Sequence, residues 1–230
     1  MINPARICII IPAYNEGRVL PTLLHTLLKL GYQMVVVDDG STDDTEQLLR
    51  TFPIYYLRHR VNLGQGAALE TGMRFAQRLD VDIFVHFDAD GQHDAAEIER
   101  LAKPVSEEKA DIVLGSRFLD AETKSAVPFS KRVLLKGAIW INGLFTGVWL
   151  SDAHNGFRAM NRKALEQIRL REAGMAHATE ILSEIKRHGL RYQEVPVLIR
   201  YSEYSQEKGQ SIWNSINILT DLIVRKIFPL

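Results

Sequence analysis

Two aspartates, Asp88 and Asp90, are the residues of this sequence best placed to do chemistry. They follow the run 83–87 (IFVHF), which is typical of a strand buried on both faces of a sheet. Residues two apart on an extended chain point to the same side, so the two carboxylates are predicted to converge just beyond the strand. Converging carboxylates repel each other unless a cation lies between them, and hard divalent cations prefer oxygen ligands. A solvated Asp-rich turn is the alternative that this pair alone leaves open.

The elements around this pair alternate between strands and helices. Apolar runs predict buried strands, and the first of them is expected to end at Pro12. Such alternation favours an α/β fold, a parallel sheet with helices on both faces. A strand ending near Ile199 is expected at a sheet edge because it contains Pro196. The predicted strands cover residues 6–11, 34–38, 54–57, 83–87, 111–114 and 192–199, and the predicted helices residues 20–28, 43–51, 66–79, 95–105, 178–188 and 212–228, with one more beginning near 161.

Composition limits the class of protein. Lys+Arg and Asp+Glu each number 28, so no global basic field favours nucleic acid as a partner, and an anionic ligand must be held by local charges. The single cysteine, Cys8, excludes an internal disulfide and suits a reducing compartment. The N-terminus lacks the layout of a signal peptide, which favours the cytoplasm. Without a repeat or linker, residues 1–230 are expected to form one domain.

Polar clusters follow four of the predicted strands, at the end where each strand stops. Ligands of parallel α/β sheets bind beyond the carboxyl ends of the strands. Four such loops would meet at one edge, which favours a binding site over four independent turns. The clusters are Tyr14-Asn15-Glu16, Asp38-Asp39-Gly40, Asp88-Ala89-Asp90 and Gly115-Ser116-Arg117.

With these clusters in place, the chain resembles family 2 glycosyltransferases of the GT-A fold, and within them the dolichyl- and polyprenyl-phosphate sugar synthases. The resemblance spans roughly residues 7 to 215, and it implies a Rossmann-like, mostly parallel sheet. Six segments in family order carry it: Ile10 to Glu16 (IIPAYNE), Val37 to Asp43 (VDDGSTD), Asn62 to Ala68 (NLGQGAA), Phe87 to His93 (FDADGQH), Gly115 to Phe118 (GSRF) and Asn155 to Met160 (NGFRAM).

The resemblance implies a nucleotide-sugar donor and a Mg²⁺ or Mn²⁺ ion. Glu16 would accept hydrogen bonds from ribose hydroxyls, and Asp39 from the base. Asp88, Asp90 and Gln92 would hold the metal against the donor diphosphate, and their oxygen ligands suit these hard ions. Asp90 is the expected catalytic aspartate. The implied nucleotide-binding residues are Pro12, Ala13, Tyr14, Glu16, Asp39 and Asp88.

The expected acceptor is a polyprenyl or dolichyl phosphate. A phosphate monoester is largely ionised near neutral pH, so it can attack the anomeric carbon without a strong protein base, with inversion. What it needs is cationic positioning, and arginine can donate two parallel bonds to phosphate. Arg117 is favoured for this role over a surface salt bridge, because it lies at the carboxyl edge of the sheet, and Arg132 is weighed equally against a solvated pair with Lys131. Arg200 and Lys208 lie on a loop that closes over the diphosphate in the resembling enzymes.

Two other functions stay open. A saccharide hydroxyl acceptor would need a general base, for which Asp152 and the pair Thr179-Glu180 are the candidates. A cap of the following turn is the alternative for Asp152, and a carboxylate on a helix face the alternative for Glu180. A nucleotide-sugar-binding module without turnover is the other. The absence of an unambiguous base disfavours the first, and the presence of both Asp88 and Asp90 disfavours the second.

Two apolar segments raise the question of a membrane. Residues 133–150 carry Trp140 and Trp149 beside Lys131-Arg132, which suits a membrane interface or a core helix. Residues 212–228 have the same two interpretations or form a homodimer face. The expectation is peripheral attachment at the cytoplasmic membrane face, with a membrane partner subunit as a further possibility.

Overall fold

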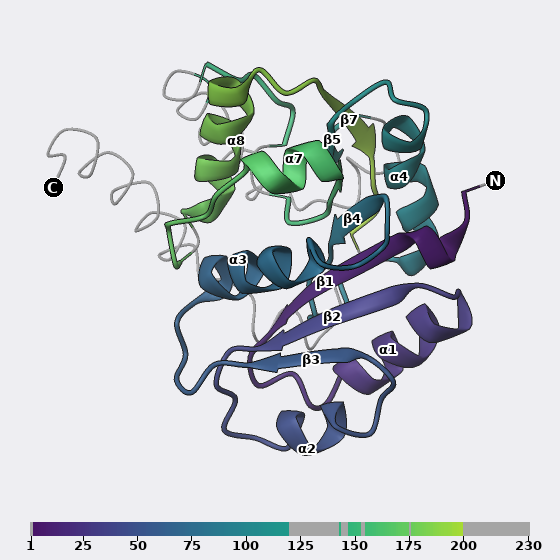
Figure 1. Ribbon diagram of the computed structural model, residues 1–230, viewed down its shortest axis with the longest axis vertical. Helices are drawn as coiled ribbons and strands as arrows, with labels where there is room; N and C mark the ends of the chain where they lie inside the picture. Colours follow the sequence, from purple (N-terminus) through teal and green to yellow (C-terminus); the bar gives the residue numbers. More distant parts are fainter. Residues whose placement is uncertain (1, 120–142, 144–146, 153–154, 175, 200–230) are drawn as a thin grey trace, which may run out of the picture.

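A computed structural model describes residues 2–119, 143, 147–152, 155–174 and 176–199 of the chain (Figure 1). These residues form a seven-stranded sheet in the order β3-β2-β1-β4-β6-β5-β7. All neighbouring strands are parallel except at β6, which is antiparallel to both β4 and β5. The strands are β1 (Ile7–Ala13), β2 (Gln33–Asp38), β3 (Tyr55–Arg58), β4 (Ile83–His86), β5 (Ile112–Ser116), β6 (Arg158–Asn161) and β7 (Tyr192–Pro196).

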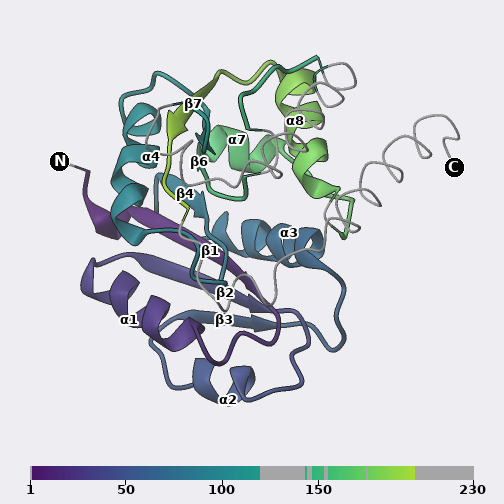
Figure 2. The same ribbon diagram turned by 180° about the vertical axis from the view of Figure 1, so that it is seen from behind.

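Helices cover both faces of the sheet, as the alternating pattern predicts (Figures 1 and 2). Successive strand residues point to opposite faces, so Ile9 packs in one core and Cys8 and Ile10 in the other. One face is covered by α1 (Leu20–Lys29), α2 (Thr45–Leu49) and α4 (Ile98–Ser106), the other by α3 (Gln65–Ala76), α7 (Arg162–Gln167) and α8 (His177–His188). Short 3₁₀ turns at Pro4–Arg6 and Ala95–Glu97 complete the described elements.

Helix α1 illustrates how the sequence sets an element. Its leucines at positions 20, 23, 24 and 27 are buried against the sheet, as the spacing predicts. The helix stops just before Gly31, whose φ of +82° lies in the left-handed region that glycine adopts without strain.

Strand β1 runs through Pro12 to Ala13, so the prediction that Pro12 ends it is wrong. The Ile10 carbonyl accepts from Phe87 on the β4 side, and the Ala13 carbonyl accepts from Asp39 on the β2 side. Backbone groups alternate in direction along a strand, so Pro12 faces the β4 side. Pairing with β4 ends at Ile10, and no ladder donor is required at Pro12.

Strand β6 was absent from the predicted elements. It is only four residues long and stands between β4 and β5, which would otherwise be neighbours. The predicted helix over residues 95–105 is a 3₁₀ turn followed by α4, because Asp94 caps the turn by accepting from the Ala96 amide. Strand β7 lies at the sheet edge, as Pro196 predicts.

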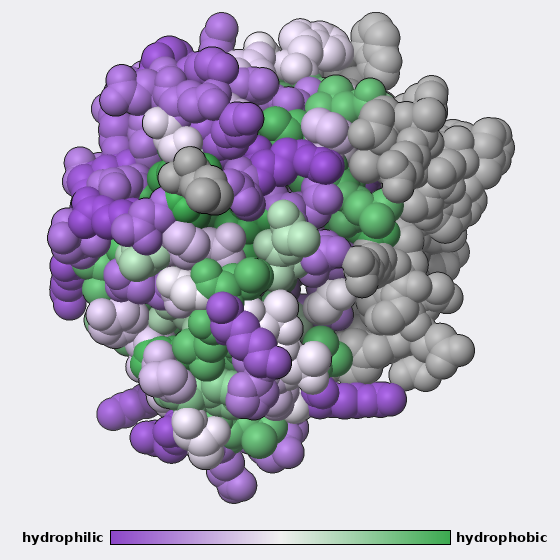
Figure 3. All heavy atoms as spheres, turned by 90° about the vertical axis from the view of Figure 1, so that its right-hand side faces the viewer, coloured by the Kyte–Doolittle hydropathy of each residue, from purple (hydrophilic) through white to green (hydrophobic). Residues whose placement is uncertain are grey.

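Some large apolar side chains of the described residues are exposed at the surface. Figure 3 shows hydrophobic residues interspersed with hydrophilic ones on the face turned to the viewer. Val61, Leu63 and Trp149 are among the exposed ones. Among the residues that the structure describes, no helix is both long and apolar enough to cross a bilayer.

Asp111, next to the first residue of β5, ties three elements together. Its carboxylate accepts from the side chain of Arg191 before β7, from Asn161 at the end of β6 and from Lys163 in α7. The hydrogen bonds from Arg191 are the largest influence on Asp111 and, against the effect of burial, hold its pKa well below the ordinary value.

Replacing Asp111 with Asn should therefore destabilise the fold in a pH-dependent way. A depressed folded-state pKa stabilises the protein above the unfolded-state pKa of about 4, and that stabilisation is lost as the pH falls through the folded-state value. We expect D111N to lower the unfolding midpoint by about 5 °C at pH 7, with the difference shrinking below pH ~4. Calorimetry from pH 7 to pH 2.5 measures this. A constant difference across that range would contradict the role of the ionised carboxylate.

Candidate active site

The polar clusters meet at one edge of the sheet, beyond the carboxyl ends of β1, β2, β4 and β5. The chain order reverses between β1 and β4, since β2 and β3 lie on one side of β1 and the later strands on the other. Such a switch point opens a crevice in α/β sheets, and ligands bind there. The sequence-predicted aspartates Asp88 and Asp90 follow β4 at this position.

Two loops at this edge of the sheet are hydrogen-bonded to each other. The Asn15 amide donates to Ser41 Oγ at 2.9 Å, and Asn15 Oδ1 accepts from the Thr42 amide at 2.8 Å. Thr45 Oγ1 accepts from the Glu16 amide. Asn15 has a φ of +54°, a left-handed conformation that asparagine tolerates.

The predicted nucleotide-binding residues of the first loop differ in exposure. Pro12 and Ala13 are buried at the end of β1, Glu16 is 9% exposed, and the Tyr14 side chain lies open to solvent at 43%. The Tyr14 ring is therefore accessible to a ligand at this edge of the sheet, whereas Pro12 and Ala13 lie within the core at the end of β1.

Asp39 points into the protein. One carboxylate oxygen accepts from the Leu63 amide and from His59 Nδ1 at 2.7 Å, and the other accepts from the Gly64 amide at 2.7 Å. His59 in turn contacts Thr71 Oγ1 at 2.9 Å. Asp39 thus fixes the loop before α3, and its predicted hydrogen bond to a base would add to these bonds.

Asp88 is held from three directions. Gln65 Nε2 at the start of α3 donates to Oδ1 at 2.8 Å, and His93 Nε2 lies 3.2 Å from Oδ2. The third contact is Gly156, where a Cβ would come within 2.4 Å of Oδ2. Burial alone would raise the pKa of Asp88, but the hydrogen bond and charge of His93 keep it below the ordinary value. Asp88 is therefore an ionised carboxylate of fixed orientation.

Asp90 follows Asp88 by two residues, and its pKa is shifted in the opposite direction. The Gln92 amide donates to Asp90 Oδ1 at 3.0 Å, and Gln92 Nε2 donates to Oδ2 at 2.6 Å. Burial, and then the charge of Asp88, raise the pKa of Asp90 to about 6. The pair thus carries more negative charge than its surroundings compensate, which is the condition for binding a cation.

The residues present fit a hard divalent ion. Asp88 and Asp90 supply carboxylate oxygens, and the Gln92 side chain supplies a carbonyl oxygen once its amide turns from Asp90. Within the described ranges, no three His, Cys, Asp or Glu side chains form a metal-binding group. The remaining ligands would have to come from the diphosphate and water, as is usual for Mg²⁺.

Arg117 and Asp152 form a pair at the end of β5. Arg117 donates to the Asp152 carboxylate from Nε at 2.6 Å and Nη2 at 2.7 Å, a two-pronged contact, and Asp152 is 2% exposed. The Asp152 and Ser151 amides both donate to Glu194 on β7, which fixes this segment. Asp152 therefore orients Arg117, and its predicted role as a base would require this pair to open.

Several predicted residues lie outside the described part of the chain. Arg132, Arg200 and Lys208 are among them, as is the apolar segment 212–228. Of the segment 133–150, Val148 and Leu150 pack in the core beneath α3 and α8, while Trp149 is 52% exposed.

Sequence reasoning assigned no role to Gln65, Glu194 or Arg158, which all lie close to the site. Gln65 and Arg158 belong to two of the motifs that carry the family resemblance, so a signal for them was present. Nothing in the sequence marked Glu194, because its contact with Ser151 spans 43 residues.

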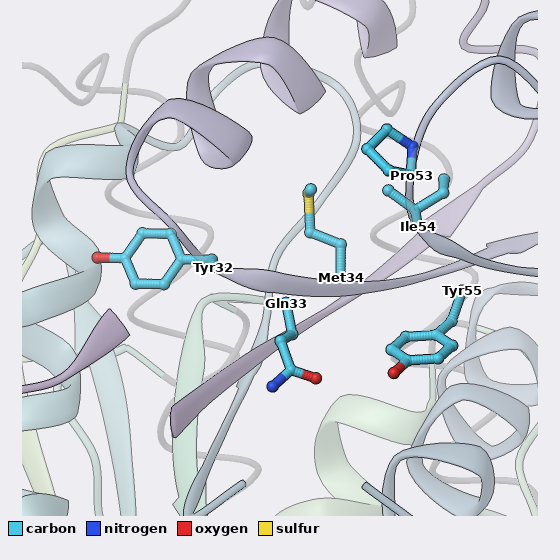
Figure 4. Close-up of a pocket in the computed structure, with 6 residues that line it drawn as sticks. All are labelled: Tyr32, Gln33, Met34, Pro53, Ile54 and Tyr55. Atoms are coloured by element: carbon cyan, nitrogen blue, oxygen red, sulfur yellow. The ribbon is translucent and has the colours of Figure 1, made fainter. Parts of the chain in front are cut away.

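The structure also has a hollow far from this edge (Figure 4). It has a volume of about 520 Å³ and is lined by Tyr32, Gln33, Met34, Pro53, Ile54 and Tyr55. These residues lie around the first residues of β2 and β3, at the opposite end of the strands from Asp88. The hollow therefore takes no part in the candidate site.

The fold is that of a GT-A glycosyltransferase. The chain superimposes on glucosyl-3-phosphoglycerate synthase from Mycobacterium tuberculosis, crystallised in complex with Mn²⁺, UDP-glucose and phosphoglyceric acid, with a TM-score of 0.66. The identity is 20%, and the superposition covers 95% of this chain and 79% of that one. At this identity the likeness concerns the fold alone.

Sequence comparison gives the family. The chain belongs to glycosyl transferase family 2, which it matches over residues 8–169. It is 30% identical to the UDP-N-acetylglucosamine–dolichyl-phosphate N-acetylglucosaminyltransferase of Methanococcus voltae, over 96% of each chain. It is 31% identical to the polyprenol monophosphomannose synthase of Mycolicibacterium smegmatis, over 88% of this chain and 80% of the relative. The predicted fold, family and enzyme class are thereby confirmed.

The contact between Arg117 and Asp152 predicts a non-additive pair of mutations. R117M and D152N should each lower kcat/KM by about 10²-fold, because the first change removes the guanidinium and the second releases it from its fixed orientation. The double variant should be no slower than R117M, and it should regain unfolding stability because R117M alone leaves Asp152 buried without its partner. Steady-state kinetics and thermal unfolding of the four proteins measure this. If instead the losses of kcat/KM in the two single variants multiply in the double variant, Asp152 contacts the substrate directly.

Proposed function

We propose that this glycosyltransferase is an inverting, metal-dependent hexosyltransferase that uses a nucleotide-sugar donor and a polyprenyl or dolichyl phosphate acceptor. The observation that carries the proposal is the pair Asp88 and Asp90 at the switch point, one fixed and ionised, the other with a pKa raised to about 6. The relative from Methanococcus voltae is a dolichyl-phosphate N-acetylglucosaminyltransferase and the one from Mycolicibacterium smegmatis a polyprenol monophosphomannose synthase, which supports the choice of acceptor.

The donor end of the reaction needs charge stabilisation. When the bond between the anomeric carbon and the diphosphate breaks, the electron pair leaves with the nucleoside diphosphate. Asp88, Asp90 and Gln92 would hold Mg²⁺ or Mn²⁺, which supplies positive charge to that leaving group. Tyr14 and Glu16, on the loop bound to residues 41–45, would border the nucleoside, as the resemblance implies.

The acceptor end of the site favours a phosphate over a hydroxyl. Of the two candidate bases, Asp152 is bound to Arg117, and the Glu180 carboxylate accepts from the Arg171 and Glu172 amides. A phosphate acceptor needs no such base, since its own oxygen carries the negative charge that attacks the anomeric carbon. Arg117, only 14% exposed in its side chain, would orient that phosphate at the crevice.

A single displacement inverts the anomeric configuration. The phosphate oxygen forms a bond to the anomeric carbon while the bond to the diphosphate oxygen breaks, and no proton needs to be removed from the acceptor. Residues 1–230 would form one catalytic domain that associates peripherally with the cytoplasmic face of the membrane, where a lipid phosphate is presented. A homodimer or a membrane partner subunit is compatible with this proposal.

The donor is tested by thermal unfolding with UDP- and GDP-sugars, each with and without Mn²⁺. A ligand that binds the folded state raises stability by RT ln(1+[L]/Kd), so one donor class should raise the midpoint only when Mn²⁺ is present. In Asp90→Asn this shift should disappear and turnover should fall at least ~10³-fold. Asp80→Asn, with a side chain 94% exposed, is the matched control. A full shift in the presence of EDTA would contradict the metal site.

The acceptor is tested with a short-chain polyprenyl phosphate, the corresponding polyprenol and a free saccharide. Transfer should occur to the phosphate alone, because the alcohols lack the negative oxygen that replaces a base. NMR of the product should show an anomeric configuration opposite to that of the donor. Transfer to the saccharide at an equal rate, or retention of configuration, would refute this part of the proposal.

A further inference from the structure

Arg158 is a buried cation directly beneath the candidate active site. It begins β6 and pairs with His86 of β4 and with Leu114 of β5. Asp88 lies two residues beyond His86, and Gly156, two residues before Arg158, touches the Asp88 carboxylate. The segment from 156 to 158 therefore passes along the end of β4, and only 1% of Arg158 is exposed.

The guanidinium is poorly satisfied for a buried group. Among the residues that the structure describes, Nε and Nη1 of Arg158 have no hydrogen-bond partner. Arg162, at the start of α7, is different, because its guanidinium donates to the carbonyls of residues 77, 79 and 81. Burying a charge without hydrogen bonds costs several kcal/mol, so Arg158 is not explained by stability of the fold.

The charge of Arg158 acts on the carboxylates around it. Burial lowers the pKa of Arg158 to about 10, and the charges of Asp88 and Asp152 oppose that shift. Burial, followed by the charge of Arg158, lowers the pKa of His86 to about 3, so His86 is neutral and does not share this role. Arg158 is thus a fixed positive charge behind the Asp88–Asp90 pair.

We propose that Arg158 is a positioning residue whose charge makes the Asp88–Asp90 pair selective for a metal ion that carries a diphosphate over the bare ion. The inference rests on the proposed function and deepens it. A bare divalent cation is repelled by the guanidinium. A complex of that cation with a nucleoside diphosphate has net negative charge and is attracted, so the same charge acts with opposite sign on the two ligands.

Because Nε and Nη1 of Arg158 have no hydrogen-bond partner among the described residues, the effect of its charge can be tested separately from the effect of its shape. If only the charge matters, Arg158→Lys keeps the selectivity although it loses the planar fork. Arg158→Met removes the charge and keeps the apolar stem. Arg162→Met, four residues along, removes a guanidinium that is bound to carbonyls and is the matched control.

The test measures binding, without turnover. Mn²⁺ alone is titrated by electron paramagnetic resonance, and UDP and GDP are titrated by calorimetry at saturating Mn²⁺, all at pH 7, where a lysine at this buried position stays protonated. In R158M we expect Mn²⁺ alone to bind about tenfold more tightly and the nucleoside diphosphate about tenfold more weakly, with an unfolding midpoint equal to or above that of the wild type. R158K should resemble the wild type. R162M should lower the unfolding midpoint and leave the ratio of the two affinities unchanged.

The outcomes separate the two proposals. If the wild type binds neither nucleotide in the presence of Mn²⁺, the proposed function fails. If the wild type binds and R158M changes both affinities in the same direction or neither of them, the role of Arg158 is refuted while the proposed function stands. A strong loss of stability in R158M, like that expected for R162M, would assign Arg158 to the fold instead.

Discussion

The mutual repulsion of Asp88 and Asp90 is the constraint on which the rest of the site depends. Two carboxylates placed at the end of one buried strand cannot both ionise at little cost, and burial together with the charge of Asp88 raises the pKa of Asp90 to about 6. Gln65, His93 and Gly156 hold Asp88 in one orientation despite this repulsion. The surrounding structure stabilises one carboxylate as an anion and leaves the other dependent on a cation.

The sheet determines where this charge lies. Reversal of chain order between β1 and β4 opens the edge at which Asp88 and Asp90 follow β4, and β5 ends in Arg117 on the same edge. The edge strand β7 also helps to position Arg117. Glu194 accepts hydrogen bonds from the backbone amides of residues 151 and 152, which fixes the position of the Asp152 carboxylate that binds Arg117. The Asp88–Asp90 pair and Arg117 are thus carried on opposite sides of β6.

Much of this arrangement could be predicted from the sequence. The remaining features could not, because they depend on contacts between residues far apart in the chain. The buried strands and the Asp88–Asp90 pair have local signals, since apolar runs and two-residue spacing depend on neighbouring residues alone. Strand β6 is four residues long and antiparallel, and its pairing with β4 and β5 is a long-range property. For the same reason the sequence could not predict that Asp152, a candidate base for a hydroxyl acceptor, pairs with Arg117, 35 residues away.

Gly156 has a consequence for how this chain can vary. Its backbone has no positive φ, so an alanine could adopt its conformation. What excludes a methyl group is the Asp88 carboxylate, 2.4 Å from where a Cβ would stand. The residue type at position 156 is therefore limited by the side chain of Asp88, which belongs to another segment of the chain. A glycine without any chemistry of its own is thus restricted by the carboxylate it accommodates, and a larger residue at 156 requires Asp88 to move or to be replaced by a smaller side chain.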